Sequence, residues 1–186
     1  MTKKEMYQKV LALIEELNPD SERLTDDPDI AAKMNYVACQ ILFELARYKK
    51  IPQYVEMAVN EGDLVTFEDI EGACGYAVYQ VNTFGGVKNT PKASGTVYKI
   101  QESGTAEIEC FVYPERITED TDDNYEFDIS QDVLEIMPYG IAADLLKSDA
   151  SSEYGKIYAD RYEAMKQLLD TRYATGGVYI EGGVMI

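Results

Sequence analysis

Residues 131–146 read QDVLEIMPYGIAADLL, an apolar stretch of helical length with Pro138 near its middle. A proline inside a helix removes a backbone donor and clashes with the preceding turn. We therefore expect a helix that kinks or restarts around Pro138. Ala142 and Ala143 follow the break, and such small side chains allow a second helix to approach closely. The stretch predicts a helix that packs against other helices.

The next segment, residues 154–169, reads YGKIYADRYEAMKQLL and carries tyrosines at every fourth position. Tyr154, Tyr158 and Tyr162 therefore lie along one face of the expected helix. Two interpretations stay open. The tyrosines complete a helical core with their hydroxyls at its edge, or they form a surface that is buried only on assembly.

Two more helices are expected near the N-terminus. Thr2 and Glu5 have the spacing of a capping box, ahead of apolar residues at helical spacing. Asp27 then precedes Pro28, which is the pattern of an N-cap followed by a proline in the first turn. We expect this second helix, residues 27–50, to pack against both helices of the C-terminal half. The reason is that each helix has an apolar face too large to leave in water.

Between these helices the apolar pattern alternates with a period of two, which is typical of strands. The segments that show it are 54–59, 63–67, 75–81, 95–100, 106–113 and 124–130. Short strands at this spacing indicate a small antiparallel sandwich. The predicted fold is therefore α+β, an α-helical bundle with an inserted antiparallel β-sandwich-like domain and an extended C-terminal tail. The bundle comprises residues 1–53 and 129–173, the inserted β-domain residues 54–128, and the docking tail residues 174–186.

The chain is strongly acidic. Its 186 residues include 34 Asp and Glu against 17 Lys and Arg, for a formal net charge of −17. Binding to nucleic acid requires Lys and Arg that displace counterions, so we expect no specific DNA binding. A negatively charged surface lets DNA pass without binding to it, although the need for solubility alone also explains such a charge. No run reaches the ~18 apolar residues of a membrane span. The N-terminus is too charged for a signal peptide, so we expect a cytoplasmic protein.

Patterns for catalysis and metal binding are sparse. The chain has no histidine, which removes the common catalytic triads and the histidine–metal sites. The run EDTDDNYEFD, residues 119–128, places Asp120, Asp122 and Asn124 at every second position, as a calcium loop does with its ligands. It fails the rest of that pattern, because Tyr125 and Gln131 occupy the positions that need Gly and Glu. We interpret the run as a solvated turn, and we expect no metal, no cofactor and no enzymatic activity.

The cysteines give no framework for a disulfide or a zinc site. Cys39, Cys74 and Cys110 are odd in number, widely spaced and without a CxxC motif. We therefore expect all three to be reduced and at least two of them to be buried.

The C-terminal half also carries a family resemblance. Residues 108–169 combine an aromatic strand ending in Tyr113-Pro114, an acidic turn, a helix containing PYGIAADLL and a helix with tyrosine at every fourth position. This run resembles the C-terminal half of the head–tail connector proteins of tailed bacteriophages, the ring-forming adaptors beneath the portal. Their helical bundle with an inserted β-domain matches the element order expected above. The resemblance covers residues 105–170 closely, and the N-terminal helices only as a pattern.

The resemblance implies a non-enzymatic virion structural protein, a ring-forming adaptor that joins the phage portal to the tail. It implies portal and tail proteins as partners, a homo-oligomeric ring on assembly, passage of DNA without specific binding, and no membrane association. The protein would reside in the virion and, during assembly, in the bacterial host cytoplasm. The alternatives are a β-sandwich binding module for a carbohydrate or protein ligand, with helical flanks, and an enzyme that uses carboxylates.

The tail reads RYATGGVYIEGGVMI from residue 172 to 186, with two apolar pieces that each follow a pair of glycines. Two interpretations stay open for it: a strand that folds back onto its own subunit's sheet, or a docking arm that adds a strand to a neighbour or to the portal. Connector proteins use their C-terminal segments in the second way, so the resemblance implies a docking arm. The candidate partner-binding residues are Val178, Tyr179, Ile180, Val184, Met185 and Ile186.

Overall fold

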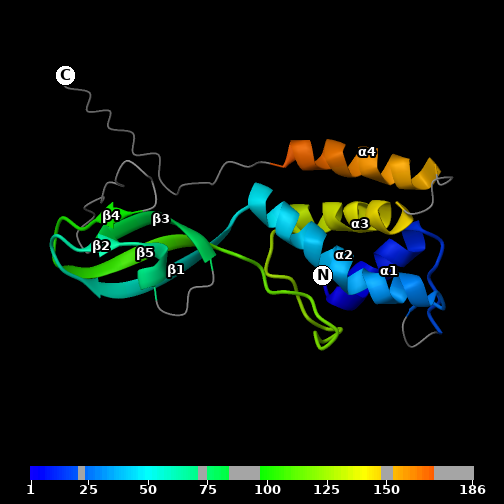
Figure 1. Ribbon diagram of the computed structural model, residues 1–186, viewed down its shortest axis with the longest axis horizontal. Helices are drawn as coiled ribbons and strands as arrows, with labels where there is room; N and C mark the ends of the chain where they lie inside the picture. The colour runs from blue at the N-terminus through cyan, green and yellow to red at the C-terminus, as the bar shows by residue number, and fades with distance from the viewer. Residues whose placement is uncertain (21–23, 71–74, 84–96, 148–152, 170–186) are drawn as a thin grey trace, which may run out of the picture.

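The computed structural model describes residues 1–20, 24–70, 75–83, 97–147 and 153–169. Within them the protein is α+β, with four α-helices and two small antiparallel sheets. Figure 1 shows the helices at one end of an elongated molecule and the strands at the other. The apolar core is divided in the same way, because one cluster of buried side chains lies among the helices and a second lies among the strands.

The first two helices begin at the capping residues that the sequence indicates. Before α1 (Lys3–Leu13), the Thr2 hydroxyl accepts a hydrogen bond from the Glu5 amide at 3.2 Å. The Glu5 carboxylate in turn accepts one from the Thr2 amide at 2.9 Å, so the capping box is confirmed. α2 (Pro28–Tyr48) begins after Asp27, whose carboxylate accepts hydrogen bonds from two amides of the first turn. Both caps satisfy donors that a helix start leaves without partners.

α3 (Gln131–Leu146) is the central helix and contacts α1, α2 and α4 (Glu153–Leu168). Most of its side chains are buried, including that of Pro138. The helix continues through Pro138 and does not restart there, whereas the expected kink stays a prediction. We attribute the continuity to packing, because the contacts of α3 with three neighbouring helices offset the hydrogen bond that the proline removes.

α2 packs against α3, as expected. Its contact with α4 is made by side chains, because an ion pair of 2.7 Å joins Glu44 of α2 to Lys166 of α4. A close approach of all three helices occurs at Gly140 of α3. A Cβ atom at this position would lie 2.7 Å from Cε2 of Tyr162 and 3.1 Å from Cγ2 of Ile41. Glycine is needed here because a side chain would overlap both neighbours.

The larger sheet has three antiparallel strands in the order β1-β5-β3. β1 (Ile51–Val59) pairs along its length with β5 (Gly104–Val112), and β3 (Gly75–Thr83) pairs with the other edge of β5. The smaller sheet pairs β2 (Leu64–Val65) with β4 (Tyr98–Lys99), and the 3₁₀ turn η1 (Phe67–Asp69) follows β2. Both sheets contribute to the second apolar cluster, whose buried residues are Val59, Val65, Ile70, Val81, Tyr98, Ile100, Ala106, Ile108 and Cys110.

The predicted strand at residues 124–130 is wrong. The segment forms a single isolated bridge, between Glu126 and Thr2, and otherwise has no strand pairing. Its alternating pattern has another cause, because Phe127 is buried in the helical cluster and Tyr125 packs against that cluster. The first backbone amides of α1 donate hydrogen bonds to carbonyls of this region. The segment is therefore an extended connection held by α1, and its apolar side chains cover the helices.

Candidate functional site

The residues predicted to bind a partner lie outside the part of the chain that the structure describes. They are Val178, Tyr179, Ile180, Val184, Met185 and Ile186. Their role stays a prediction. The described residues contain a different candidate site, a cleft at the place where the helices meet the larger sheet. We call it the junction cleft.

The junction cleft has a volume of about 450 Å³ and is built by three passages of the chain between the helices and the strands. Residues 51–53 start β1 just after α2, residues 112–115 leave the end of β5, and residues 125–129 lead into α3. Because all three passages cross the same junction, positions that are far apart in the sequence come together there.

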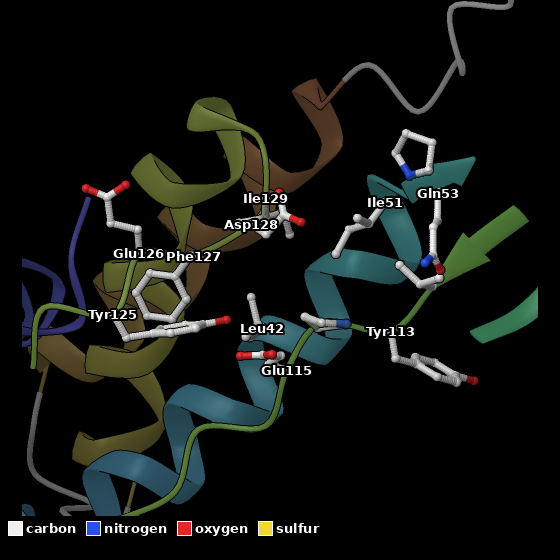
Figure 2. Close-up of a pocket in the computed structure, with 13 residues that line it drawn as sticks. Leu42, Ile51, Gln53, Tyr113, Glu115, Tyr125, Glu126, Phe127, Asp128 and Ile129 are labelled. Atoms are coloured by element: carbon white, nitrogen blue, oxygen red, sulfur yellow. The ribbon is translucent and has the colours of Figure 1, made fainter. Parts of the chain in front are cut away.

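The walls of the junction cleft are apolar. Leu42 of α2, Ile51 of β1 and Phe127 line it, and all three are largely buried. Figure 2 shows Phe127 on one side of Leu42 and Tyr113 on the other. A concave apolar site with a few polar groups at its edge is the usual form of a binding pocket.

Carboxylates surround this apolar centre. Glu115, Glu126 and Asp128 line the junction cleft, and all three are exposed. No lysine or arginine in the described ranges forms a salt bridge with any of them. Figure 2 shows Glu115 and Asp128 around Leu42 and Ile51. The cleft is therefore apolar inside and negative at its edge.

The phenol of Tyr125 responds to this negative charge. Burial raises the pKa of Tyr125 above its ordinary value of 10.0. The charge of Glu115, a hydrogen bond with the same carboxylate and the charge of Asp128 raise the pKa further. The phenolate form of Tyr125 is disfavoured because its negative charge would lie beside those two carboxylates. The same electrostatic potential favours a cation.

The acidic turn next to the cleft has a structural role. Lys3 is buried at the start of α1, where its ammonium donates a hydrogen bond to the carbonyl of Thr121 and lies 3.4 Å from Asp123. These contacts attach the turn to the helices. Within the described ranges, no group of three or more His, Cys, Asp or Glu side chains is arranged to hold a metal ion.

A second charged cluster joins α2 to α4. Lys166 is buried, and its ammonium lies 2.7 Å from Oε1 of Glu44 and 2.5 Å from Oε1 of Glu163. The same ammonium lies 5.1 Å and 4.8 Å from the ring centres of Tyr48 and Tyr162. Burial alone would lower the pKa of Lys166, but hydrogen bonds to Glu163 and Glu44 outweigh burial and raise it. Lys166 therefore stays charged and holds α4 against α2.

The three tyrosines of α4 have different environments. Tyr162 is 5% exposed, whereas Tyr158 is half-buried and donates a hydrogen bond to the last carbonyl of α1 at 2.5 Å. These two complete the helical core, as one of the two interpretations predicts. Tyr154 is 61% exposed and lies on the outer side of α4 with Ile157 and Leu168, which are 55% and 84% exposed. We call these three exposed residues the α4 strip.

No helix in the described part of the chain is long and apolar enough to cross a membrane. No protein-family model matches the chain, and no curated protein matches it.

Sequence reasoning missed the junction cleft as a site. Part of its signal was visible, because Tyr113-Pro114 and the alternation of Tyr125 with Phe127 stand out in the sequence. Both features indicated strand ends. Only the fold brings them beside Leu42, because strands β1 to β5 separate Leu42 from Tyr113 along the chain.

Proposed function

We propose that this protein is a non-enzymatic virion structural protein, a ring-forming adaptor that joins a bacteriophage portal to the tail. In this proposal the helices act as a bundle, the strands as an inserted sandwich-like domain, and residues 174–186 as a docking arm. Its partners are the portal protein, the tail proteins and further copies of itself. It resides in the host cytoplasm during assembly and then in the virion.

The observation that carries the proposal is the order in which the elements pack. Helices from the two ends of the described chain meet on α3, and the described strands all lie between α2 and α3 in sequence. This is the arrangement of the connector proteins that residues 105–170 resemble. The resemblance of residues 105–170 and this element order favour the same class of protein.

The surface supports the same proposal. The α4 strip, Tyr154, Ile157 and Leu168, places apolar side chains in water on an isolated subunit. Contact with a neighbouring copy in a ring would cover them, and tyrosine is common at such interfaces. The net charge of −17 suits a ring through which DNA passes, because like charge prevents adhesion to phosphate.

The test is copurification with the portal protein encoded in the same genome. We expect the tagged full chain to retain the portal in a complex of fixed stoichiometry. The variant that lacks residues 176–186 should keep a nearly unchanged Tm and retain no portal. A deletion that unfolds the protein would show that the tail belongs to the core. A full chain that never retains the portal would rule out the adaptor.

A binding module for a carbohydrate or protein ligand is the second candidate. The junction cleft favours it, because a binding module needs a concave apolar site of this kind. The two candidates differ in their assembly. A binding module stays monomeric at all concentrations and binds its ligand without a portal, whereas the adaptor functions only in a ring.

A further inference from the structure

We propose that the junction cleft is a docking site for a partner polypeptide that presents an apolar side chain flanked by lysine or arginine. The proposal rests on the geometry and charge of the cleft and does not depend on ring assembly. It holds equally for the adaptor and for a binding module.

The size of the cleft sets the apolar part of the ligand. Its volume of about 450 Å³ lies within the ~300–1,000 Å³ range of pockets that take small ligands. A helix or a folded domain is too large for it, whereas one or two side chains fit. Leu42, Ile51 and Phe127 offer only carbon atoms to such a group. The hydrophobic effect therefore favours an aliphatic or aromatic side chain there.

The charge at the edge sets the cationic part. Glu115, Glu126 and Asp128 are exposed carboxylates for which the described ranges supply no salt-bridge partner. Two of them also act on the phenol of Tyr125 inside the cleft. A lysine or arginine on either side of an inserted apolar group would reach these carboxylates. An acidic peptide or a nucleic acid would be repelled.

A polypeptide meets both requirements at once. Glu115 and Asp128 are exposed and lie around Leu42 in Figure 2, whereas Leu42, Ile51 and Phe127 are buried. A ligand must therefore place its apolar group centrally and its cations beside it. Successive side chains of an extended peptide point to opposite faces, but the flexible four-carbon stem of lysine lets its ammonium reach back to the edge of the cleft beside an inserted leucine.

The experiment is a titration of the ¹⁵N-labelled full-length protein followed by amide chemical shifts. The probe is a short blocked peptide that alternates lysine with leucine. One control peptide replaces lysine with glutamate, and a second replaces leucine with serine. We expect the lysine–leucine peptide to give saturable shifts at residues 51–53, 112–115 and 125–129, and neither control to do so.

A charge-neutral variant tests the role of the carboxylates. Glu115→Gln together with Asp128→Asn keeps the shape of two exposed side chains, and the amide spectrum itself reports whether the fold is retained. We expect about tenfold weaker binding, because each exposed ion pair contributes only modestly. The matched control is Glu56→Gln with Glu107→Gln, which neutralises two exposed carboxylates that face each other on β1 and β5, outside the cleft. This control should bind as tightly as the unaltered protein.

Each contrary result overturns the proposal in a distinct way. Equal binding of the lysine–serine peptide would mean attraction to the acidic surface without use of the apolar walls. Equal binding of the glutamate–leucine peptide would mean that the carboxylates do not select the ligand. Absence of saturable shifts at the cleft with millimolar lysine–leucine peptide would mean that the site does not take this class of partner.

Discussion

Replacing Gly140 with alanine adds one methyl group where α2, α3 and α4 meet. The new Cβ would lie 2.7 Å and 2.9 Å from two ring carbons of Tyr162 and 3.1 Å from Cγ2 of Ile41. Carbon atoms in contact prefer a separation of ~3.5–4.0 Å. Tyr162 is 5% exposed and Ile41 is 6% exposed, so moving either side chain aside would disturb packed contacts. α4 must therefore shift, or the ring must leave its preferred position.

Two opposing effects set the size of the change. Alanine is favoured over glycine inside a helix by ~1 kcal/mol. Overpacking a well-filled core costs about 1–3 kcal/mol, and contacts this short belong to the upper part of that range. The clash wins, so we expect Gly140→Ala to lower the free energy of unfolding by about 1–2 kcal/mol. For a chain of this length that corresponds to a fall in Tm of roughly 2–8 °C.

Urea unfolding followed by circular dichroism measures the change, with the m value as a check that only stability has altered. Gly104→Ala, at the start of β5, is the control. A Cβ at this position would meet no heavy atom within 4 Å, so its effect should be small. Gly140→Ala should cost less stability in a Tyr162→Leu background, because the two closest ring carbons are then gone and only the 3.1 Å contact with Ile41 remains.

A stabilising effect of Gly140→Ala in the otherwise unaltered protein would refute this reasoning. It would mean that α4 lies further from α3 than the structure has it, and that helix propensity alone decides the result. An equal loss of stability with and without Tyr162 would place the cost somewhere other than the contact between these helices.

Three further outcomes follow from the buried polar groups. Lys166→Ala should lower the free energy of unfolding, measured in urea, by about 2 kcal/mol, and Lys166→Met by less than ~1 kcal/mol. The reason is that methionine keeps the packing of the lysine stem, while the partner carboxylates return to water. Equal losses for the two variants would contradict this. Burial raises the pKa of both Tyr7 and Tyr162 above the ordinary value of 10.0. Their contribution to stability is therefore complete below pH 10.0 and is lost as the pH rises above it. Thermal unfolding between pH 9 and pH 11 should show this loss, and Tyr7→Phe should reduce its slope. Cys110 is fully buried, and burial, followed by the charge of Glu109, raises the pKa of its thiol. Ellman's reagent should therefore modify Cys110 only as the protein unfolds, and more slowly than the half-buried Cys39. Modification of Cys110 within seconds would contradict the burial.

The helices could be predicted from the sequence because their signals are local. The capping residues Thr2 and Asp27 bond to the first turn of the helix that follows each of them. The apolar spacing of α2 and of α3 indicates the buried face of each helix without reference to its partners. Apolar residues continue at helical spacing to Leu17, just before Asn18-Pro19, whereas α1 ends at Leu13. Glu15 has a φ of 61°, a left-handed conformation that ends the helical path and that apolar spacing does not reveal.

The β-region was predicted less well because alternation shows burial and not pairing. Tyr125 and Phe127 alternate with polar residues, yet they cover helices. A proline such as Pro52 is typical of the end of a helix, but β1 already begins at Ile51, and an edge strand tolerates proline. Two of the three cysteines lie in the described chain, where Cys110 is buried and Cys39 is half-buried. Cys74 lies outside it, so the expectation of two buried thiols stays a prediction.

The junction cleft could not be predicted from the sequence for a similar reason. Leu42 reads as one more apolar residue of α2, and Ile51 reads as part of the connection after it. Their common role depends on how the strands leave the helices. That geometry is set by pairing of β1 with β5 over residues 51–59 and 104–112, which are far apart in the chain.

Native mass spectrometry of the full chain mixed with the portal ring from the same genome tests the adaptor proposal most directly. The proposal predicts one dominant complex, in which a fixed number of copies of this protein closes a ring on each portal, and this complex should be absent when residues 176–186 are deleted. A protein that remains monomeric beside unoccupied portal rings, at concentrations well above those of an infected cell, would contradict it.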